Sequence, residues 1–207
     1  MRQKTSELLY DYWNFARNGR LAPYRYEIDP AQIATLLPEI FLAKYDGPTD
    51  YSIRLAGTRI CYQLGRELTG KNLLDFWSSD DREALACLLH IVVSDGAVAS
   101  AQFAAQRADG RAVDFEMTAM PLFHNSHSID RILGSITTIG NTFWLGNAQL
   151  VTFELKTVDL IWPDGAPMAT NPYSVGQNEP PALRLHSRAT TTAGIPQLTV
   201  LPGGLSD

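Results

Sequence analysis

Residues 51–77 read YSIRLAGTRICYQLGRELTGKNLLDFW, and this stretch decides the fold expected for the chain. It opens with alternating apolar and polar residues, the pattern of a half-buried strand. Gly57 then ends the strand, and Thr58 can cap a short helix with one apolar side. Gly65 and Gly70 punctuate a loop before the chain returns to the core. The stretch predicts one wall of a small apolar pocket, which suits ligand or partner binding better than catalysis.

The N-terminal residues predict an amphipathic helix over residues 5–18, with an apolar and aromatic stripe on one side. Asn18-Gly19 is a typical helix end. Aromatic side chains are enriched both in cores and at interfaces, so two placements remain open. The stripe packs on its own domain, or it is buried against a second copy. In the second case Leu9, Tyr12 and Trp13 form the interface of a homodimer.

Local patterns on both sides of residues 51–77 indicate a hairpin and two further helices. Strands near residues 40–45 and 51–56 flank the turn signal Asp46-Gly47-Pro48. Upstream, Asp29-Pro30 has the features of a helix start. Downstream, capping residues at 78–81 are followed by apolar residues at helical spacing, which predicts one long helix that ends at Asp95-Gly96.

A second hairpin is expected around Asp109-Gly110, the strongest short hairpin signal in the chain. In its second arm, apolar Val113, Phe115 and Met117 alternate with polar residues, which predicts one core face and one mostly solvent-exposed face. The polar residues are Asp114, Glu116 and Thr118. Residues 131–140 supply the last strand.

The domain organisation follows from where these patterns stop. Residues 163–181 are rich in Pro, Asn and Gly and offer little to bury. We therefore expect an N-terminal helix over residues 1–20, a domain over 21–145, and a partly disordered C-terminal extension over 146–207.

The composition is that of a globular chain with a core: 207 residues, 45% of them apolar, with a formal net charge of −5. A nucleic-acid binder needs a clustered positive face. The nearest basic run, Arg17, Arg20 and Arg25, is read as a solvated helix exit, so no nucleic-acid partner is expected. The longest apolar run is broken by His90 and is too short to span a membrane, and no signal peptide is apparent. These features predict a cytoplasmic protein without a membrane partner.

Several short motifs in this order resemble the single-domain PAS family of alphaproteobacterial proteins, the PAS_5 type. The resemblance covers residues 13–140, and residues 53–70 are its most specific part. It implies an α+β fold, with a PAS-like five-stranded antiparallel sheet and short helices over one face. It also implies a sensory or regulatory role, with output through a partner protein rather than an attached enzyme. The motifs are Gly19-Arg20-Leu21, Ile28-Asp29-Pro30, Leu36-Leu37-Pro38, Ala56-Gly57-Thr58 and Gly65-Arg66-Glu67-Leu68-Thr69-Gly70.

The expected ligand pocket is mostly apolar, as small-molecule sites usually are. At its mouth, Arg66 and Lys71 either bind an anionic ligand or pair with Glu67 or Asp75. A PAS-type module of this kind binds a small ligand or a partner protein and signals by a conformational or dimer change. The alternative is a scaffold with a filled core that acts only through protein contacts, with Phe103, Met120 and Trp13 as exposed apolar residues. The pocket residues are Ile53, Leu55, Ile60, Cys61, Leu64, Phe76, Phe115, Met117 and Ile136.

Residues that carry chemistry elsewhere do not predict an enzyme here. Cys61 lies roughly where photosensory PAS domains keep a flavin-reactive cysteine, but the residues around it lack the matching Asn and Arg. His90 is read as a packed histidine rather than a haem ligand, and His124 and His127 lack further ligands for a metal site. No catalytic motif is present. The cofactor, if any, is left unassigned.

Overall fold

The computed structural model describes residues 1–125, 128–140, 142–146, 148–165 and 199–202. An α-helix, α1, begins the chain, and the longer helix α3 follows the short helix α2; three 3₁₀ turns lie between the elements. The helices are α1 (Lys4–Arg17), α2 (Thr58–Leu64) and α3 (Ser79–Asp95), and the turns are η1 (Arg25–Glu27), η2 (Leu37–Glu39) and η3 (Leu73–Phe76). The strands are β1 (Ile40–Gly47), β2 (Asp50–Ala56), β3 (Val98–Arg107), β4 (Ala112–Phe123), β5 (Ile129–Ile139), β6 (Leu150–Trp162) and β7 (Thr199–Pro202).

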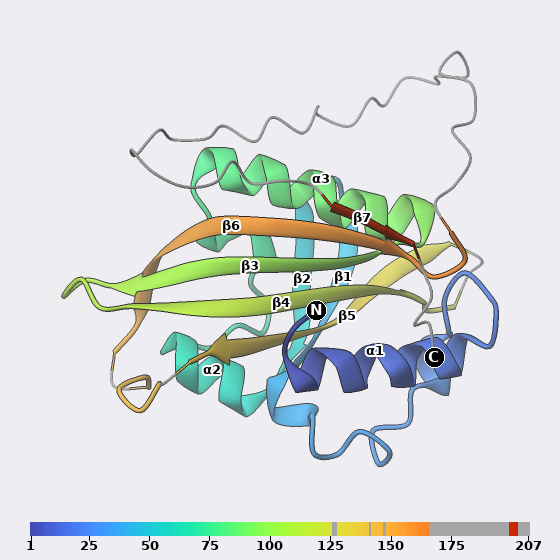
Figure 1. The fold of residues 1–207 in the computed structure, drawn as a ribbon, viewed down its shortest axis with the longest axis horizontal. Coiled ribbons are helices and arrows are strands. Elements are labelled where there is room, and N and C mark those ends of the chain that lie inside the picture. Colours follow the sequence, from blue (N-terminus) through green and yellow to red (C-terminus); the bar gives the residue numbers. More distant parts are fainter. Residues whose placement is uncertain (126–127, 141, 147, 166–198, 203–207) are drawn as a thin grey trace.

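The strands form one sheet in the order β2-β1-β5-β4-β3-β6-β7 (Figure 1). The first six are antiparallel neighbours, and β7 pairs with the end of β6 in parallel. The five expected strands are therefore present, and β6 is an additional antiparallel strand.

The position of β6 corrects the expected domain boundary. This strand was placed in an extension after residue 145, but it pairs with β3 along almost its whole length. Phe153, Val158 and Leu160 are buried in the main core. The content of residues 151–162 is strand-like, but strand pairing is non-local, so the sequence did not show that this strand pairs with β3. The expectation of disorder falls mainly on residues 166–198 and 203–207, which lie outside the described residues.

The short helices and α3 cover one face of the sheet, as expected, and the N-terminal helix α1 covers the other. In Figure 1, α3 and α1 lie on opposite sides of the strands. Along β4, Phe115 and Met117 point to the core beneath α2, η3 and α3. Met120 points to the opposite face and packs in a second apolar cluster with Leu9 and Trp13 of α1. The face that was predicted to be mostly solvent-exposed is therefore partly an interior.

The apolar stripe of α1 packs on its own sheet, which corrects the predicted dimer interface. Leu9 and Trp13 are fully buried, and the Trp13 indole Nε1 donates to the Pro121 carbonyl oxygen at 2.8 Å. Tyr12 is partly buried, and its hydroxyl accepts from the Asp29 amide at 2.7 Å. Of the two open placements, packing on the chain's own domain is the one observed, so Leu9 and Trp13 cannot be an exposed interface.

Charged groups tie one end of α1 to β4 and the other end to the turn that follows β6. The buried Glu116 carboxylate accepts from the backbone amides of Arg2 at 2.7 Å and Gln3 at 3.1 Å, just before the helix begins. At the other end, the buried Arg17 guanidinium forms a bidentate pair with Asp164, with N–O distances of 2.7 and 2.9 Å. A helix N-terminus favours negative charge and a C-terminus positive charge, so both ties match the helix dipole.

Two local predictions near the first hairpin need correction. The helix expected from Asp29-Pro30 is absent: residues 30–36 form turns, and only the 3₁₀ turn η2 follows them. Gly57 was expected to supply backbone freedom, but its φ of −63° is open to any residue. Its role is close approach, because a Cβ there would lie 2.2 Å from the Pro38 carbonyl oxygen.

Candidate functional site

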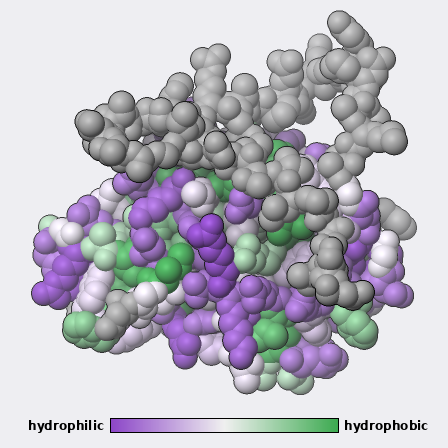
Figure 2. Space-filling model, viewed as in Figure 1, coloured by the Kyte–Doolittle hydropathy of each residue, from purple (hydrophilic) through white to green (hydrophobic). Residues whose placement is uncertain are grey.

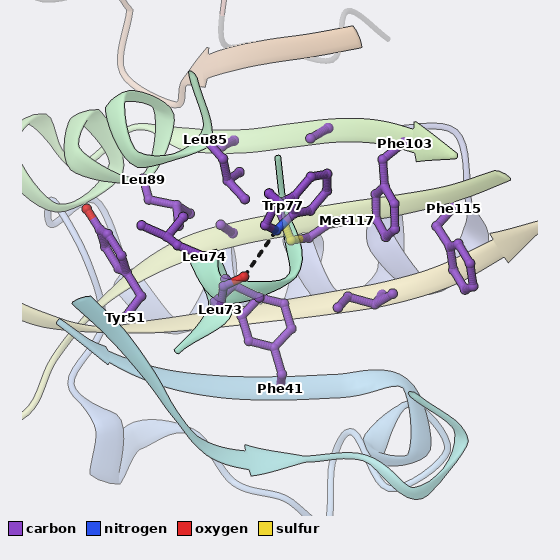
Figure 3. Close-up of a cluster of buried hydrophobic side chains, with 14 of the residues drawn as sticks. Phe41, Tyr51, Leu73, Leu74, Trp77, Leu85, Leu89, Phe103, Phe115 and Met117 are labelled. Atoms are coloured by element: carbon purple, nitrogen blue, oxygen red, sulfur yellow. Dashed lines mark hydrogen bonds between the residues drawn. The ribbon is translucent and has the colours of Figure 1, made fainter. Parts of the chain in front are cut away.

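The expected pocket lies where η3 and α2 cross the sheet. Aromatic side chains from the end of η3 and from the sheet fill it. Figure 3 shows Trp77 between the helices and the strands, with its indole Nε1 bonded to the Leu73 carbonyl oxygen at 3.1 Å. The Trp77 ring meets Phe103 edge-on with centroids 5.0 Å apart, and Phe103 stacks on Phe115 at 5.1 Å. Phe153 of β6 lies 5.9 Å from Trp77. Edge-on and offset rings at these separations pack favourably.

The space left among these rings is very small. The residual cavity has a volume of about 10 Å³, and a cavity of roughly this size holds at most one water molecule. Its lining is entirely apolar, so a water there would find no hydrogen-bond partner. At this site the interior is thus filled by side chains of the described residues. The lining residues are Leu64, Leu68, Leu73, Phe76, Trp77, Phe103, Met117, Ile136 and Phe153.

The structure brings together most of the predicted pocket residues but places them differently. Leu64, Phe76, Met117 and Ile136 line the residual cavity. Ile53, Ile60 and Phe115 are buried in the same core without lining it, and Cys61 packs partly buried at its margin. Leu68, Leu73, Trp77, Phe103 and Phe153 line the cavity but were missing from the prediction.

Leu55 was wrongly assigned to the pocket, because it is 46% exposed. In the pairing of β1 with β2, Leu42 faces Leu55 and Ala43 faces Ile53, which leaves Arg54 as an extra residue. Such a bulge shifts the alternation by one residue and turns the following side chain to the other face. No local pattern reveals this bulge.

The three residues predicted to be exposed for partner binding are all buried: Phe103 is 1% exposed, and Met120 and Trp13 are 0% exposed. Phe103 belongs to the core beneath α2, η3 and α3, whereas Met120 and Trp13 belong to the second cluster, beneath α1. The sheet face that would have exposed Met120 is covered by the N-terminal helix. These residues therefore offer no docking surface in this structure.

Arg66 closes the edge of the aromatic core. Its guanidinium lies 5.1 Å from the centre of the Phe76 ring and 5.7 Å from that of Phe153, within range of cation–π attraction. It donates to the Leu150 carbonyl oxygen at the start of β6. When the side-chain oxygen of Gln149 is turned toward Arg66, Arg66 Nη2 donates to that oxygen at 2.9 Å. Burial lowers the pKa of Arg66 from its ordinary value, although an arginine stays charged in proteins.

The salt bridges considered for the pocket mouth do not form there. Asp75 pairs with Arg82 at 3.0 Å, and the Glu67 carboxylate accepts from the Leu68 and Thr69 amides. Lys71 is exposed, and its backbone, rather than its side chain, bonds to β2. Arg66 therefore lies at the margin of the core, whereas the Lys71 side chain is in no ion pair with the residues that the structure describes.

Neither cysteine is in a disulfide. Burial raises the pKa of the Cys61 thiol, which lies 3.7 Å from a Glu67 carboxylate oxygen. Burial also raises the pKa of Cys87. A raised thiol pKa leaves less of the nucleophilic thiolate at neutral pH.

We expect both thiols of the native chain to be alkylated by iodoacetamide more slowly at pH 7.5 than a solvated thiol, and the rate to rise as the pH is raised above 9. Mass spectrometry of the intact chain measures each addition, and the Cys61→Ser variant assigns them. The unfolded chain in urea is the control and should react rapidly at both sites. Fast labelling of Cys61 in the native chain at pH 7 would contradict this account of its surroundings.

The histidines do not form a metal site within the described residues. No group of three or more His, Cys, Asp or Glu side chains there is arranged to hold a metal ion. His90 is partly buried beside Tyr45, with ring centroids 6.5 Å apart, and it does not line the residual cavity. His127 lies outside the described residues. The described helices include none long and apolar enough to cross a membrane.

An antiparallel sheet with strand order β2-β1-β5-β4-β3-β6, with short helices over an aromatic core, is an α+β fold. The chain belongs to the PAS domain family, whose sequence profile matches residues 1–137. Domains of this kind are sensory modules and are typically not enzymes. No curated protein matches the sequence.

Solved structures resemble a little over half of the chain. A Rhodobacter sphaeroides light-oxygen-voltage protein is 16% identical, with a TM-score of 0.42 over 56% of this chain and 71% of that one. A light-oxygen-voltage domain studied with a flavin analogue is 15% identical, with a TM-score of 0.43 over 54% of this chain and 84% of that one. The PAS domain of an HTR-like protein from Haloarcula marismortui is 17% identical, with a TM-score of 0.37 over 53% and 90%.

Proposed function

We propose that this chain is a regulatory PAS module that works through protein contacts at its surface, with its core filled by its own side chains. The observation that carries the proposal is the cavity of about 10 Å³ at the place where a ligand was expected. Small-molecule sites typically have volumes of about 300–1,000 Å³. A core packed to this degree leaves recognition to the outer surface.

The outer side of α1 is the surface best suited to such a contact. Leu8 and Phe15 are 44% and 79% exposed, and they lie two turns apart on the same side of the helix. Beside them, a groove of about 410 Å³ runs between α1 and the segment that follows it. We call Leu8, Phe15 and this groove the α1 docking face. The groove is lined by Tyr12, Phe15, Ala16, Asn18, Arg20, Glu27 and Gln32.

Hydrophobic residues are also exposed elsewhere on the surface, among them Tyr62 and Val151. Figure 2 shows hydrophobic residues in several separate patches among hydrophilic ones on one side of the molecule. Small apolar patches rimmed by polar residues are typical of contacts that form and dissociate. This pattern is consistent with a regulatory role, in which binding must be reversible.

A second candidate function is small-ligand sensing after the core opens, and Arg66 is the observation that favours it. Its side chain covers Phe76 and Phe153, which line the residual cavity, and Phe76 itself is only partly buried. Displacement of Arg66 and Phe76 would enlarge the cavity toward solvent. Such a pocket would be a minor state that a ligand stabilises by binding it preferentially.

The two candidates are separated by what the purified chain contains and contacts. We expect native mass spectrometry to give the mass of the polypeptide alone, and flavin mononucleotide or haem to leave the melting temperature unchanged. A photoreactive residue in place of Phe15 should cross-link a second protein in cells, whereas one in place of exposed Leu55 should not. The cross-linked protein, once purified, should bind the native chain but not a Leu8→Glu/Phe15→Glu variant.

Two results would overturn the proposal. A stoichiometric small molecule retained by the native chain would make it a ligand sensor. A purified partner that binds the Leu8→Glu/Phe15→Glu variant as tightly as the native chain would remove the α1 docking face. Because both replaced residues are exposed, the double variant should keep its stability to within about 1 kcal/mol, so a loss of binding would not reflect unfolding.

A further inference from the structure

Charge on the α1 docking face limits which partner it can take. Glu7 and Asp11 are exposed and lie one turn apart beside Leu8. Within the part of the chain that the structure describes, neither carboxylate is in an ion pair. Of the basic residues of α1, Lys4 is exposed at the first turn, whereas Arg17 is buried against Asp164. The middle of the exposed side is therefore apolar with an acidic border.

The groove beside this border adds no free positive charge. Arg20 is its basic lining residue, and its guanidinium is paired with the Glu27 carboxylate at 2.8 Å. The same guanidinium donates to the Ala16 and Arg17 carbonyl oxygens at the end of α1. The aromatic rings of Tyr12 and Phe15 line the groove as well, and aromatic faces attract cations.

Resting on the proposed function, we propose that the α1 docking face takes an amphipathic helix of another protein that carries lysine or arginine beside its apolar residues. Amphipathic helices bind through apolar residues at a spacing of three, four and seven, which matches Leu8 and Phe15. Basic residues on the partner would neutralise Glu7 and Asp11 and help steer the encounter. The groove would receive one large apolar side chain, held between Phe15 and Tyr12.

The same charge pattern argues against a second copy as the occupant. In an antiparallel pair of identical helices, equivalent flanks lie together, so Glu7 and Asp11 of each copy would border the same flank. Like charges placed side by side in an interface oppose association. A basic partner helix removes this repulsion, whereas self-association retains it.

The test uses two synthetic helical peptides with one apolar face, identical except that lysines or glutamates flank it. Fluorescence anisotropy with the full chain should show the lysine peptide binding roughly tenfold or more tightly than the glutamate peptide, an advantage that falls with added salt. The Glu7→Lys/Asp11→Lys variant should reverse the order of the two peptides. A control variant, Asp50→Lys/Glu154→Lys, changes the net charge equally at exposed sites elsewhere and should keep it.

Three outcomes would overturn the inference, and they differ in what they leave standing. The first is loss of the preference at this site: the two peptides bind equally, or the control variant also reverses their order, which would reduce the preference to net charge. A concentration-dependent dimer that Leu8→Glu/Phe15→Glu disrupts would make a second copy the occupant and leave a protein contact at this face. If neither peptide binds and position 15 cross-links nothing in cells, the proposed function fails together with the inference.

Discussion

Replacement of Trp77 by alanine should lower the free energy of unfolding by about 3–5 kcal/mol, the usual range for deletion of a large buried aromatic side chain. Trp77 is 8% exposed, contacts the Phe103 and Phe153 rings, and bonds to the Leu73 carbonyl oxygen. The change removes these contacts and leaves a carbonyl group without its donor. Urea denaturation followed by far-ultraviolet circular dichroism measures the loss.

The same variant should acquire a binding site that the native chain lacks. The space vacated by the indole adjoins the existing residual cavity and is lined by apolar residues. Engineered apolar cavities of about 150 Å³ bind benzene-sized molecules. We therefore expect indole to raise the melting temperature of Trp77→Ala but not that of the native chain.

Phe15→Ala is the matched control for this experiment, because it removes an aromatic side chain that is 79% exposed. Its free energy of unfolding should change by no more than about 0.5 kcal/mol, and indole should have no effect. If indole also stabilises the native chain, the native core already opens to ligands. That result would favour ligand sensing over a module with a filled core.

Replacement of Glu116 by alanine should lower the free energy of unfolding by about 2–4 kcal/mol, because it leaves two backbone amides at the start of α1 without their charged acceptor. These are the amides of Arg2 and Gln3, and the Glu116 side chain between the helix and β4 is fully buried. We also expect α1 to detach more often, which hydrogen exchange followed by mass spectrometry would report as faster exchange in residues 4–17.

Two further variants make this experiment specific. Glu116→Gln keeps one carbonyl oxygen and should lose less stability than the alanine variant. Asp114→Ala removes a carboxylate two residues earlier that pairs with Lys156 at a partly exposed site, and such pairs contribute about 0–1 kcal/mol. Equal losses in Glu116→Ala and Asp114→Ala would show that the tie to α1 does not stabilise the fold.

Much of the fold could be predicted because local sequence patterns indicate its helices and hairpins. The terminal helix, the hairpin before residue 57, the long helix and the later hairpin each have their own periodicity and end signals, and each is observed. Gly65 ends α2 with a left-handed backbone, φ +70°, as its position indicated. These features depend on neighbours within a few residues, which the sequence displays directly.

The site could be predicted only in part, because the face of a strand on which a residue lies depends on bulges and on what covers the sheet. Leu55 followed the alternation of β2 until the bulge at Arg54 turned it outward. Glu116 had the pattern of a solvent-exposed residue, but α1 buries it. Phe153 was assigned to a tail, yet it fills the place where a ligand was expected. These three placements depend on contacts between residues far apart in the sequence, which no local pattern indicates.

The sequence by itself was enough to place the chain in the PAS domain family, because its short motifs resemble those of the family and the family profile matches residues 1–137. The tertiary structure alone decided that the core is filled and that α1 covers the second face of the sheet. Packing sets both, because side chains from β3, β6 and η3 meet across long stretches of chain. That packing is why we propose the outer side of α1, rather than the interior, as the site of recognition.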